Sequence, residues 1–333
     1  MAENRGEMTM VKWGIIGLGN IAQRFIKGLS YTDGVLVAGA SRTAEKRADH
    51  QARFPEMTVY GDYEELLGDP NVDAVYIALP HGLHREWSIK AMAAGKAVLC
   101  EKPAGLNPDE VREMVAASQK YDVFFMEALK TRFIPLIQEI KKDLVAGIIG
   151  KITKMECSFC TPPSAGPMRA ERQRIPAIQR GVLLDIGPYP IGFLLDMMEG
   201  VRVLNLGASV DVDEEDVDRY FTVNMAFING VLGIAHGGDL PEADRMGYIH
   251  GTDGVMEIPT HYRPEAYKVT LTDGRVLEKR VPIVGDDFTG EIAEVHRCLS
   301  AGLTESPRMG HGASIQLAEM MAWAYEEVGR HIR

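Results

Sequence analysis

The sequence predicts an α/β protein in two parts: an N-terminal parallel-sheet domain, then an α+β domain with a large, mostly antiparallel, open-faced sheet. Apolar strands and helices alternate over the first part, which indicates βαβ units. Short strands joined by tight turns dominate the second part. A length of 333 residues suits about two domains. We expect the domains to span residues 1–130 and 131–333.

The strands of the first part are apolar runs bounded by glycine or polar turns. They are expected at residues 11–18, 35–41, 72–80, 97–100 and 123–129. The segments between them have the composition of helices, at residues 20–31, 43–54, 84–94 and 107–121. A strand followed by a helix and another strand places successive strands parallel in one sheet.

The second part opens with an amphipathic helix over residues 133–147 and then changes to short strands. Strands are expected at 151–160, 203–210, 217–227, 231–237, 245–251, 254–258, 267–272 and 275–281, and closing helices at 287–301 and 311–330. Asn229-Gly230 and Asp273-Gly274 are hairpin turn signals. We therefore expect a mostly antiparallel sheet that carries a few helices.

Charge and composition exclude several classes of partner. The net charge of −11 argues against nucleic acid and anionic membranes, both of which require basic patches. No apolar run is long enough to span a membrane, and the N-terminus lacks the apolar core of a secretory signal. The four cysteines are expected to be free thiols in a cytoplasmic protein. Cys157 and Cys160 have no further ligands nearby, so no metal site is expected.

The motif GLGNIA, which begins at Gly17, has the form GxGxxA between a strand and a helix. Gly17 permits a tight turn, Gly19 lets the backbone approach a pyrophosphate, and Ala22 keeps the helix near the sheet. The amides of Asn20 and Ile21 open the helix, where an anion is favoured. The alternative is a turn of small residues that serves packing. The context favours a dinucleotide site and a Rossmann-type domain.

The end of the second strand predicts which dinucleotide binds. An NAD site usually places an acid there for the ribose 2′-hydroxyl, whereas this chain has Ser41, Arg42 and Thr43. A guanidinium pairs with a 2′-phosphate, and Lys46 and Arg47 follow one turn later. NADP is therefore the predicted cofactor, with NAD possible if Arg42 only stacks on the adenine.

A buried strand at 97–100 ends on Glu101, Lys102 and Pro103. Ligands of open parallel sheets bind beyond the carboxyl ends of the strands. Proline biases the preceding residue toward an extended backbone, so the Lys102 ammonium is expected to point into the cofactor crevice, with Glu101 helping to hold it. The alternative is a surface ion pair at a strand end.

Four stretches of the chain together resemble one family. Combined with GxGxxA, they are similar to the Gfo/Idh/MocA oxidoreductases, and in particular to the branch with dimeric dihydrodiol dehydrogenase and NADP-dependent D-xylose 1-dehydrogenase. The stretches are GKAVLCEKP, MEALKTRF, GVLLDIGPYPI and ESPRMGHGASIQLAEMM.

The resemblance implies a Rossmann domain followed by an open-faced domain often used for dimerisation. It also implies that Lys102, Asp185 and Tyr189 are catalytic. The chain departs from the family at Ala97, where histidine is frequent, and at Lys130, where this branch often has tryptophan. Lys130 lies near the expected substrate side, so it puts the usual substrate of the branch in doubt.

The chemistry of these residues agrees with alcohol oxidation, which needs a base for the hydroxyl proton. Asp185 and Tyr189 face the same way if a helix begins near them, as Gly187 and Pro188 suggest. A nearby ammonium and the positive cofactor ring would lower the pKa of the Tyr189 phenol. We expect Tyr189 to exchange the proton, Lys102 to stabilise the developing oxyanion, and Asp185 to orient the substrate or the lysine. Two alternatives stay open: Lys102 as the base, and Tyr189 as a core aromatic.

Three further residues are candidates for contact with cofactor or substrate. Leu79 and His84 follow a strand beside the expected nicotinamide, and His84 could instead cap the next helix. Arg132 is expected to join Lys102, Asp185 and Tyr189 in binding the substrate, or else to form an ion pair at a helix start.

The sequence thus predicts an NADP-preferring dehydrogenase that acts on a sugar, a cyclic polyol or a trans-dihydrodiol, and that forms a homodimer or a higher homo-oligomer. The first alternative is an NAD-dependent inositol or sugar-derivative dehydrogenase, which Arg42 disfavours. The second alternative is a non-catalytic regulator that senses nucleotide. A regulator without catalytic activity would have no need of both Lys102 and Tyr189, which this chain keeps.

Overall fold

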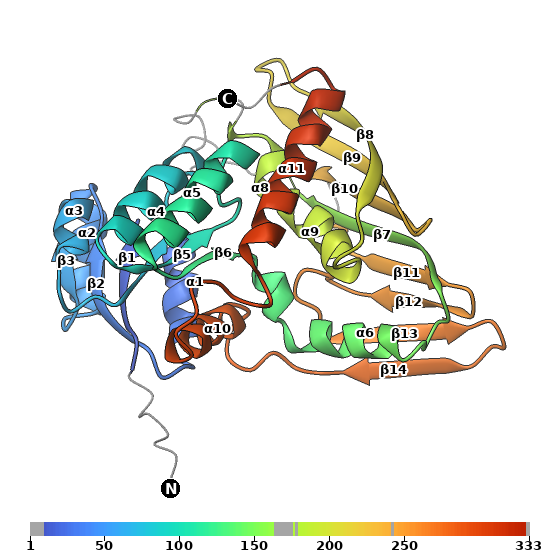
Figure 1. The fold of residues 1–333 in the computed structure, drawn as a ribbon, viewed down its shortest axis with the longest axis horizontal. Helices are drawn as coiled ribbons and strands as arrows, with labels where there is room; N and C mark the ends of the chain where they lie inside the picture. Colours follow the sequence, from blue (N-terminus) through green and yellow to red (C-terminus); the bar gives the residue numbers. More distant parts are fainter. Residues whose placement is uncertain (1–9, 163–175, 177–178, 241–242, 331–333) are drawn as a thin grey trace, which may run out of the picture.

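Two sheets lie side by side in the computed structural model, which describes residues 10–162, 176, 179–240 and 243–330 (Figure 1). The first sheet has six parallel strands in the order β3-β2-β1-β4-β5-β6. Its strands are β1 (Lys12–Ile16), β2 (Val35–Ala40), β3 (Thr58–Tyr60), β4 (Ala74–Ile77), β5 (Ala97–Glu101) and β6 (Phe125–Ala128). The chain runs outward from β1 to β3 and then crosses back to β4. The connections therefore diverge between β1 and β4, where open sheets bind their ligands.

Helices cover this sheet between its strands, as expected. They are α1 (Asn20–Leu29), α2 (Ala44–Arg53), α3 (Tyr63–Leu67), the short η1 (His81–Leu83), α4 (His84–Ala93) and α5 (Pro108–Tyr121). Asn107 caps α5 by accepting a hydrogen bond from the Glu110 amide at 3.0 Å, and Pro108 occupies the first helical position, where no amide partner is needed. β3 and α3 were not predicted from the sequence. Both are too short to display a period.

The core of the first sheet leads to the candidate site. Trp13 packs edge-on against Phe25 with ring centroids 5.1 Å apart, and Phe25 stacks on Tyr76 at 4.1 Å. All three side chains are fully buried. The Tyr76 hydroxyl donates to the carboxylate of Glu101 at the end of β5, so the apolar core ends at a polar group under that strand end.

The second sheet has eight strands in the order β14-β13-β12-β11-β7-β10-β9-β8, and only the β7–β10 pair among them is parallel. All eight predicted strands are present. They are β7 (Ile152–Thr161), β8 (Val203–Val212), β9 (Asp218–Phe227), β10 (Leu232–Asp239), β11 (Gly247–Gly251), β12 (Gly254–Ile258), β13 (Ala266–Leu271) and β14 (Val276–Arg280). Both predicted hairpins are confirmed, because Gly230 and Gly274 adopt the left-handed φ that these turns require.

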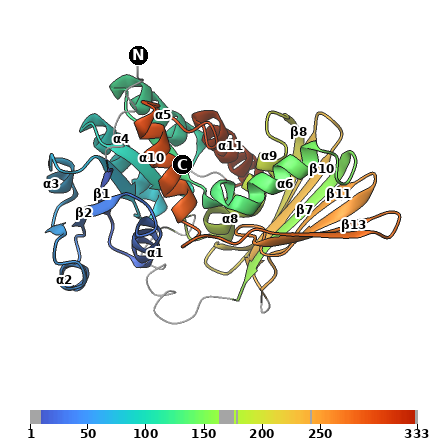
Figure 2. The same ribbon diagram turned by 90° about the horizontal axis from the view of Figure 1, so that it is seen from below.

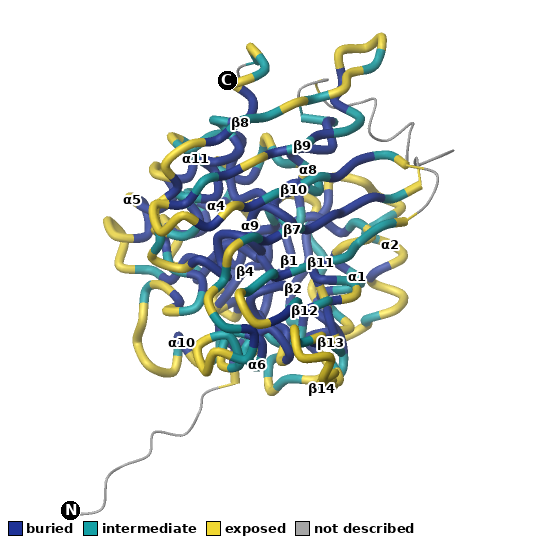
Figure 3. The backbone as a smooth tube through the Cα atoms, turned by 90° about the vertical axis from the view of Figure 1, so that its right-hand side faces the viewer, coloured by how far each residue is buried: buried dark blue, intermediate teal, exposed yellow. Residues whose placement is uncertain are grey.

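Helices cover one face of the second sheet (Figure 2). They are α6 (Pro135–Val145), which follows the short η2 (Lys130–Phe133), and α8 (Val182–Ile186) and α9 (Pro188–Met197). No described helix covers the opposite face, which Figure 3 views directly. The predicted open-faced sheet is therefore observed.

The last two helices pack against the first domain, and α11 also packs on β8 of the second sheet. α10 (Thr289–Ser300) packs on α1, and the Trp13 indole donates to His296 at 2.9 Å. α11 (His311–Glu327) packs against both α5 and α9 (Figure 1). The division at residue 130 falls between the strands of the two sheets, but the C-terminal helices join them. That boundary stays a prediction.

Three findings concern the described residues alone. All four cysteines are free and buried. No described helix is long and apolar enough to cross a membrane. Within the described ranges, no group of three or more histidine, cysteine, aspartate or glutamate side chains is arranged to hold a metal ion.

Candidate active site

The glycine turn between β1 and α1 has the geometry that a pyrophosphate site needs. Gly17 has a φ of +101°, and a Cβ there would lie 2.4 Å from the carbonyl oxygen of Ala78, so no larger residue fits. A Cβ on Gly19 would instead meet no atom within 4 Å, which leaves the space beside the first amides of α1 open. Asn20 and Ile21 are exposed at that helix start. These residues fit a dinucleotide.

Two guanidinium groups lie near the end of β2. Arg47 donates to the carbonyl oxygen of Ser41 at 2.7 Å, and the exposed Arg42 lies over the ring of Tyr63 at 5.4 Å. Residues 41–43 contain no acid. The arrangement can receive a 2′-phosphate. Of these two residues, only Arg42 was predicted as part of the site.

Lys102 and Asp185, which are distant in the sequence, meet above the end of β5. The Lys102 ammonium donates to the Asp185 backbone carbonyl and lies 3.2 Å from its carboxylate. The same ammonium lies 5.1 Å from the centroid of the Tyr189 ring. The structure thus brings together the three residues predicted to be catalytic, and their roles stay a prediction.

Glu101 does not hold the Lys102 side chain as expected. Its carboxylate accepts hydrogen bonds from the Tyr76 hydroxyl and from the backbone amide of Lys102, the latter at 3.2 Å. Burial raises the pKa of Glu101, although the nearby Lys102 ammonium partly offsets this. Asp185 holds the ammonium instead.

A buried carboxylate fixes the helix that carries Asp185. Asp218 accepts a hydrogen bond from the Leu183 amide at 2.7 Å, at the start of α8. A Cβ on Gly181 would lie only 1.7 Å from the Asp218 carboxylate, so this glycine makes the contact possible. Asp218 on β9 therefore stabilises the conformation of the GVLLDIG stretch.

Asp185 and Tyr189 lie on two successive helices, not on the single helix considered above. α8 ends at Ile186 and α9 begins at Pro188, since proline cannot donate the hydrogen bond that would continue α8. A Cβ on Gly187 would lie 2.1 Å from the Leu183 carbonyl oxygen. The small residue allows the two helices to join tightly.

The Tyr189 ring belongs to an aromatic group below the site. It stacks on Phe159 with ring centroids 4.9 Å apart and lies 5.5 Å from the ring of Tyr262. Burial raises the pKa of the Tyr189 phenol above its ordinary value, although the Lys130 ammonium acts in the opposite direction. The expectation of a lowered pKa is therefore wrong for the protein groups alone, because burial outweighs the neighbouring cation.

His84 neither caps α4 nor offers surface to a cofactor. It is fully buried, with its ring nitrogens 2.8 Å from the carbonyl oxygens of Pro103 and Leu79. Burial lowers its pKa. The side chain ties the loop after β4 to the loop after β5. A Cβ built on Gly17 would lie 3.0 Å from the side chain of Leu79. Leu79 therefore lines the glycine turn.

Arg132 is committed to structural contacts. Its side chain is buried, lies 3.4 Å from the Asp196 carboxylate, and donates to the Arg308 carbonyl oxygen at 2.9 Å. This matches the ion pair given above as the alternative, and it leaves the guanidinium turned to Asp196 and Arg308. The prediction that Arg132 binds substrate finds no support in these contacts.

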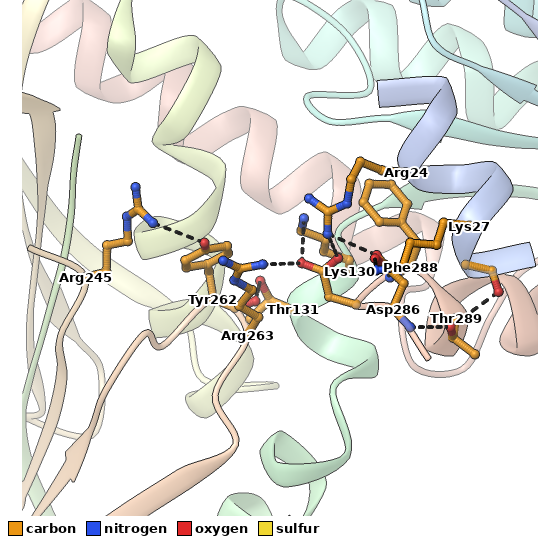
Figure 4. Close-up of polar contacts among 12 residues, drawn as sticks. Arg24, Lys27, Lys130, Thr131, Arg245, Tyr262, Arg263, Asp286, Phe288 and Thr289 are labelled. Atoms are coloured by element: carbon orange, nitrogen blue, oxygen red, sulfur yellow. Dashed lines mark hydrogen bonds and ion pairs between the residues drawn. The ribbon is translucent and has the colours of Figure 1, made fainter. Parts of the chain in front are cut away.

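Three cationic side chains that were not predicted as site residues lie around Tyr262 (Figure 4). Arg245 donates to the Tyr262 hydroxyl at 3.3 Å, and Arg263 lies over its ring at 5.2 Å. Lys130 approaches the same ring at 5.8 Å and pairs with Asp287 at 3.0 Å. Only Lys130 carried a sequence signal, as a departure from the branch pattern.

Comparison with known proteins identifies the family. Residues 11–129 match a model described as "Oxidoreductase family, NAD-binding Rossmann fold", and residues 137–257 match the "GFO/IDH/MocA C-terminal domain". The chain belongs to the Gfo/Idh/MocA oxidoreductases. The resemblance stated from the EKP and DIGPY stretches is thereby confirmed, as is the Rossmann-type first domain.

Similar curated proteins span nearly the whole chain. A trans-1,2-dihydrobenzene-1,2-diol dehydrogenase of Xenopus laevis is 31% identical over 330 residues, which cover 96% of this chain and 98% of that protein. An NADP⁺-dependent scyllo-inositol 2-dehydrogenase of Bacillus subtilis is 30% identical, with 96% and 98% covered. An NADP⁺-dependent D-xylose 1-dehydrogenase of Hypocrea jecorina is 30% identical, with 97% and 93% covered.

Solved structures share the fold. A 3-ketoreductase from Actinomadura kijaniata superposes with a TM-score of 0.84 at 24% identity, covering 94% of this chain and 96% of that one. The two-sheet architecture is therefore that of the family.

Proposed function

We propose that this oxidoreductase prefers NADP and transfers a hydride between the nicotinamide and a hydroxyl group of a sugar, cyclic polyol or trans-dihydrodiol. The observation that carries the proposal is the meeting of Lys102, Asp185 and Tyr189 above the carboxyl end of the first sheet. Relatives named for diol, inositol and xylose dehydrogenation support the substrate class.

The bound nicotinamide would supply the hydride acceptor. During oxidation the carbinol C–H bond breaks with its electron pair, and the hydroxyl proton passes to a protein base. Tyr189 is the proposed base, and Lys102 stabilises the charge that develops on the substrate oxygen. Asp185 holds the Lys102 ammonium within 3.2 Å of its carboxylate, so it orients the lysine. Lys102 as the base is the alternative.

The cofactor preference rests on Arg42 and Arg47. Both are cationic and lie where an NAD site usually carries an acid. The second candidate function, an NAD-dependent inositol or sugar-derivative dehydrogenase, would leave these two guanidinium groups without a phosphate partner.

We further propose a homodimer formed through the uncovered face of the second sheet, and a cytoplasmic location. The uncovered sheet face offers a large surface for self-association (Figure 3). Leu232 on β10 is about half exposed and adds apolar area to the molecular surface. The four free, buried cysteines agree with a reducing compartment. Light scattering on the purified protein measures the oligomeric state directly.

The test of the proposed chemistry is turnover by matched variants. Lys102→Met and Tyr189→Phe are expected to lower kcat at least about a hundredfold, the range of positioned proton transfer, while NADP⁺ still binds. Tyr121→Phe removes an exposed hydroxyl outside the site and serves as the control, with unchanged turnover. Both site variants retaining more than a tenth of the rate would contradict the assignment. NADP⁺ binding without turnover in the unmodified protein would favour the nucleotide-sensing regulator.

A further inference from the structure

Lys130 places a second ammonium group beside the proposed catalytic tyrosine, and Figure 4 shows it close to Phe288. It is the first residue of η2, directly beyond the end of β6, and its side chain is only 8% exposed. The ammonium lies 4.6 Å from the ring of Phe288, 5.8 Å from that of Tyr262 and 5.9 Å from that of Tyr189. A buried lysine enclosed by three rings is unusual unless it has an acidic partner.

Asp287 is that partner and fixes the position of the ammonium. The Lys130 nitrogen lies 3.0 Å from one Asp287 oxygen, and the other oxygen accepts a hydrogen bond from Arg24 on α1. Arg263 lies 3.8 Å from the same carboxylate. Burial would lower the pKa of Lys130, but Tyr189 and Asp287 raise it above its ordinary value. The side chain therefore carries its positive charge near Tyr189.

Lys102 also lies near the Tyr189 ring, but its ammonium is held by a different carboxylate. It donates to both the carbonyl and the carboxylate of Asp185, so a negative charge stands beside it. Apart from burial, Lys130 has the largest effect on the pKa of Tyr189, and it lowers that pKa. The acids Glu101, Asp185 and Glu291 act in the opposite sense.

We propose that Lys130 is a positioning residue for Tyr189: its ammonium stabilises the phenolate that accepts the substrate proton, and Asp287 holds it there. This inference rests on the proposed function. In the oxidation step the hydroxyl O–H bond breaks, the proton joins the Tyr189 oxygen, and the carbinol hydride leaves with its electron pair to NADP⁺. The substrate becomes a carbonyl compound, and the proton later passes from Tyr189 to solvent. Lys102, held by Asp185, acts on the substrate oxygen.

The charged groups around Lys130 determine the sign of the expected effect. Asp287 and Glu291 face it from the α10 region, and Arg263 approaches from the loop after β12. Burial raises the pKa of Glu291 well above its ordinary value. Replacing Lys130 by a neutral residue therefore leaves Tyr189 near the acids without its cation, and its phenolate forms only at higher pH.

The experiment compares Lys130→Met and Lys130→Gln with Lys130→Arg in the full-length protein. For the two neutral variants, the pH profile of kcat/KM for oxidation is expected to move upward by about one unit or more, a tenfold loss on the acidic side. The arginine variant keeps the charge and is expected to retain the original profile. A merely structural role would lower the rate without moving the profile.

A second readout does not depend on turnover. The ¹³Cζ resonance of Tyr189, assigned by its loss in Tyr189→Phe, reports phenolate formation with NADP⁺ bound. The neutral variants are expected to raise its titration midpoint in the same direction. An unchanged midpoint and pH profile, with Tyr189→Phe inactive, would overturn this inference and leave the proposed function intact. No turnover in the unmodified protein would overturn both.

Discussion

Replacing Gly181 by alanine should disturb the proposed active site, although Gly181 is not one of the proposed site residues. A Cβ at this position would lie 1.7 Å from one Asp218 oxygen and 2.3 Å from its Cγ. Asp218 cannot retreat easily, because its side chain is fully buried and also receives a hydrogen bond from Tyr325. Either the carboxylate shifts or the start of α8 moves, and Asp185 lies on that helix.

The expected cost follows from two effects. Overpacking of a dense core costs about 1–3 kcal/mol. Loss of the hydrogen bond from the Leu183 amide to the Asp218 carboxylate costs about 1.5–3 kcal/mol more if it breaks fully. We expect Gly181→Ala to lower the free energy of unfolding by about 1–3 kcal/mol if that hydrogen bond survives and by about 2.5–6 kcal/mol if it breaks. It should also lower kcat, while NADP⁺ binding at the glycine turn persists.

Urea unfolding and steady-state kinetics measure both effects. Gly312→Ala is the matched control, because a Cβ there meets no atom within 4 Å and the residue lies within α11. It is expected to leave activity unchanged and to stabilise the protein by up to about 1 kcal/mol. If Gly181→Ala unfolds within about 0.5 kcal/mol of the unmodified protein and retains full turnover, Asp218 does not hold α8 as described.

Two further predictions concern the cofactor and the pH dependence of stability. Arg47→Ala should weaken NADP⁺ binding about tenfold and leave NAD⁺ binding nearly unchanged in calorimetric titrations, since a charge-assisted contact to phosphate is lost; equal losses for both cofactors would contradict the assignment. Burial lowers the pKa of His261 to about 4 from 6.5, so the neutral ring stabilises the fold above pH 6.5 and this stability is lost as pH falls toward 4. Between about pH 7 and pH 5 the free energy of unfolding is expected to fall by about 2 kcal/mol through this residue. Urea unfolding measured across this pH range tests the prediction, which is refuted if His261→Gln loses stability with falling pH as steeply as the unmodified protein.

The strands of the second sheet were predictable because their side chains alternate and their turns are chemically marked. Asn229-Gly230 and Asp273-Gly274 fixed the two hairpins, since glycine adopts the positive φ that such turns need. The three-residue β3 offered no comparable pattern and was missed. Local periodicity predicts an element only when the element is long enough to repeat it.

The site was predictable only where a motif carries its own geometry. Gly17 must be glycine because Ala78 closes the space around it, and this constraint is visible in the sequence. The contact of Lys130 with Asp287 depends on how the segment before α10 returns to the first sheet, which no local pattern encodes. His84 and Arg132 contact buried carbonyls and a carboxylate, a role that polar residues near a motif can take as readily as ligand binding, so the sequence alone could not separate the two.

The most direct test of the proposed function is the reduction of NADP⁺ in the presence of aldoses, inositols and trans-dihydrodiols, with NAD⁺ run in parallel. Absorbance of the reduced nicotinamide follows the reaction. We expect reduction of NADP⁺, at a higher kcat/KM than NAD⁺, with at least one of these classes, and its loss in Lys102→Met. Binding of NADP⁺ with no reduction of either cofactor by any class would contradict the proposed function.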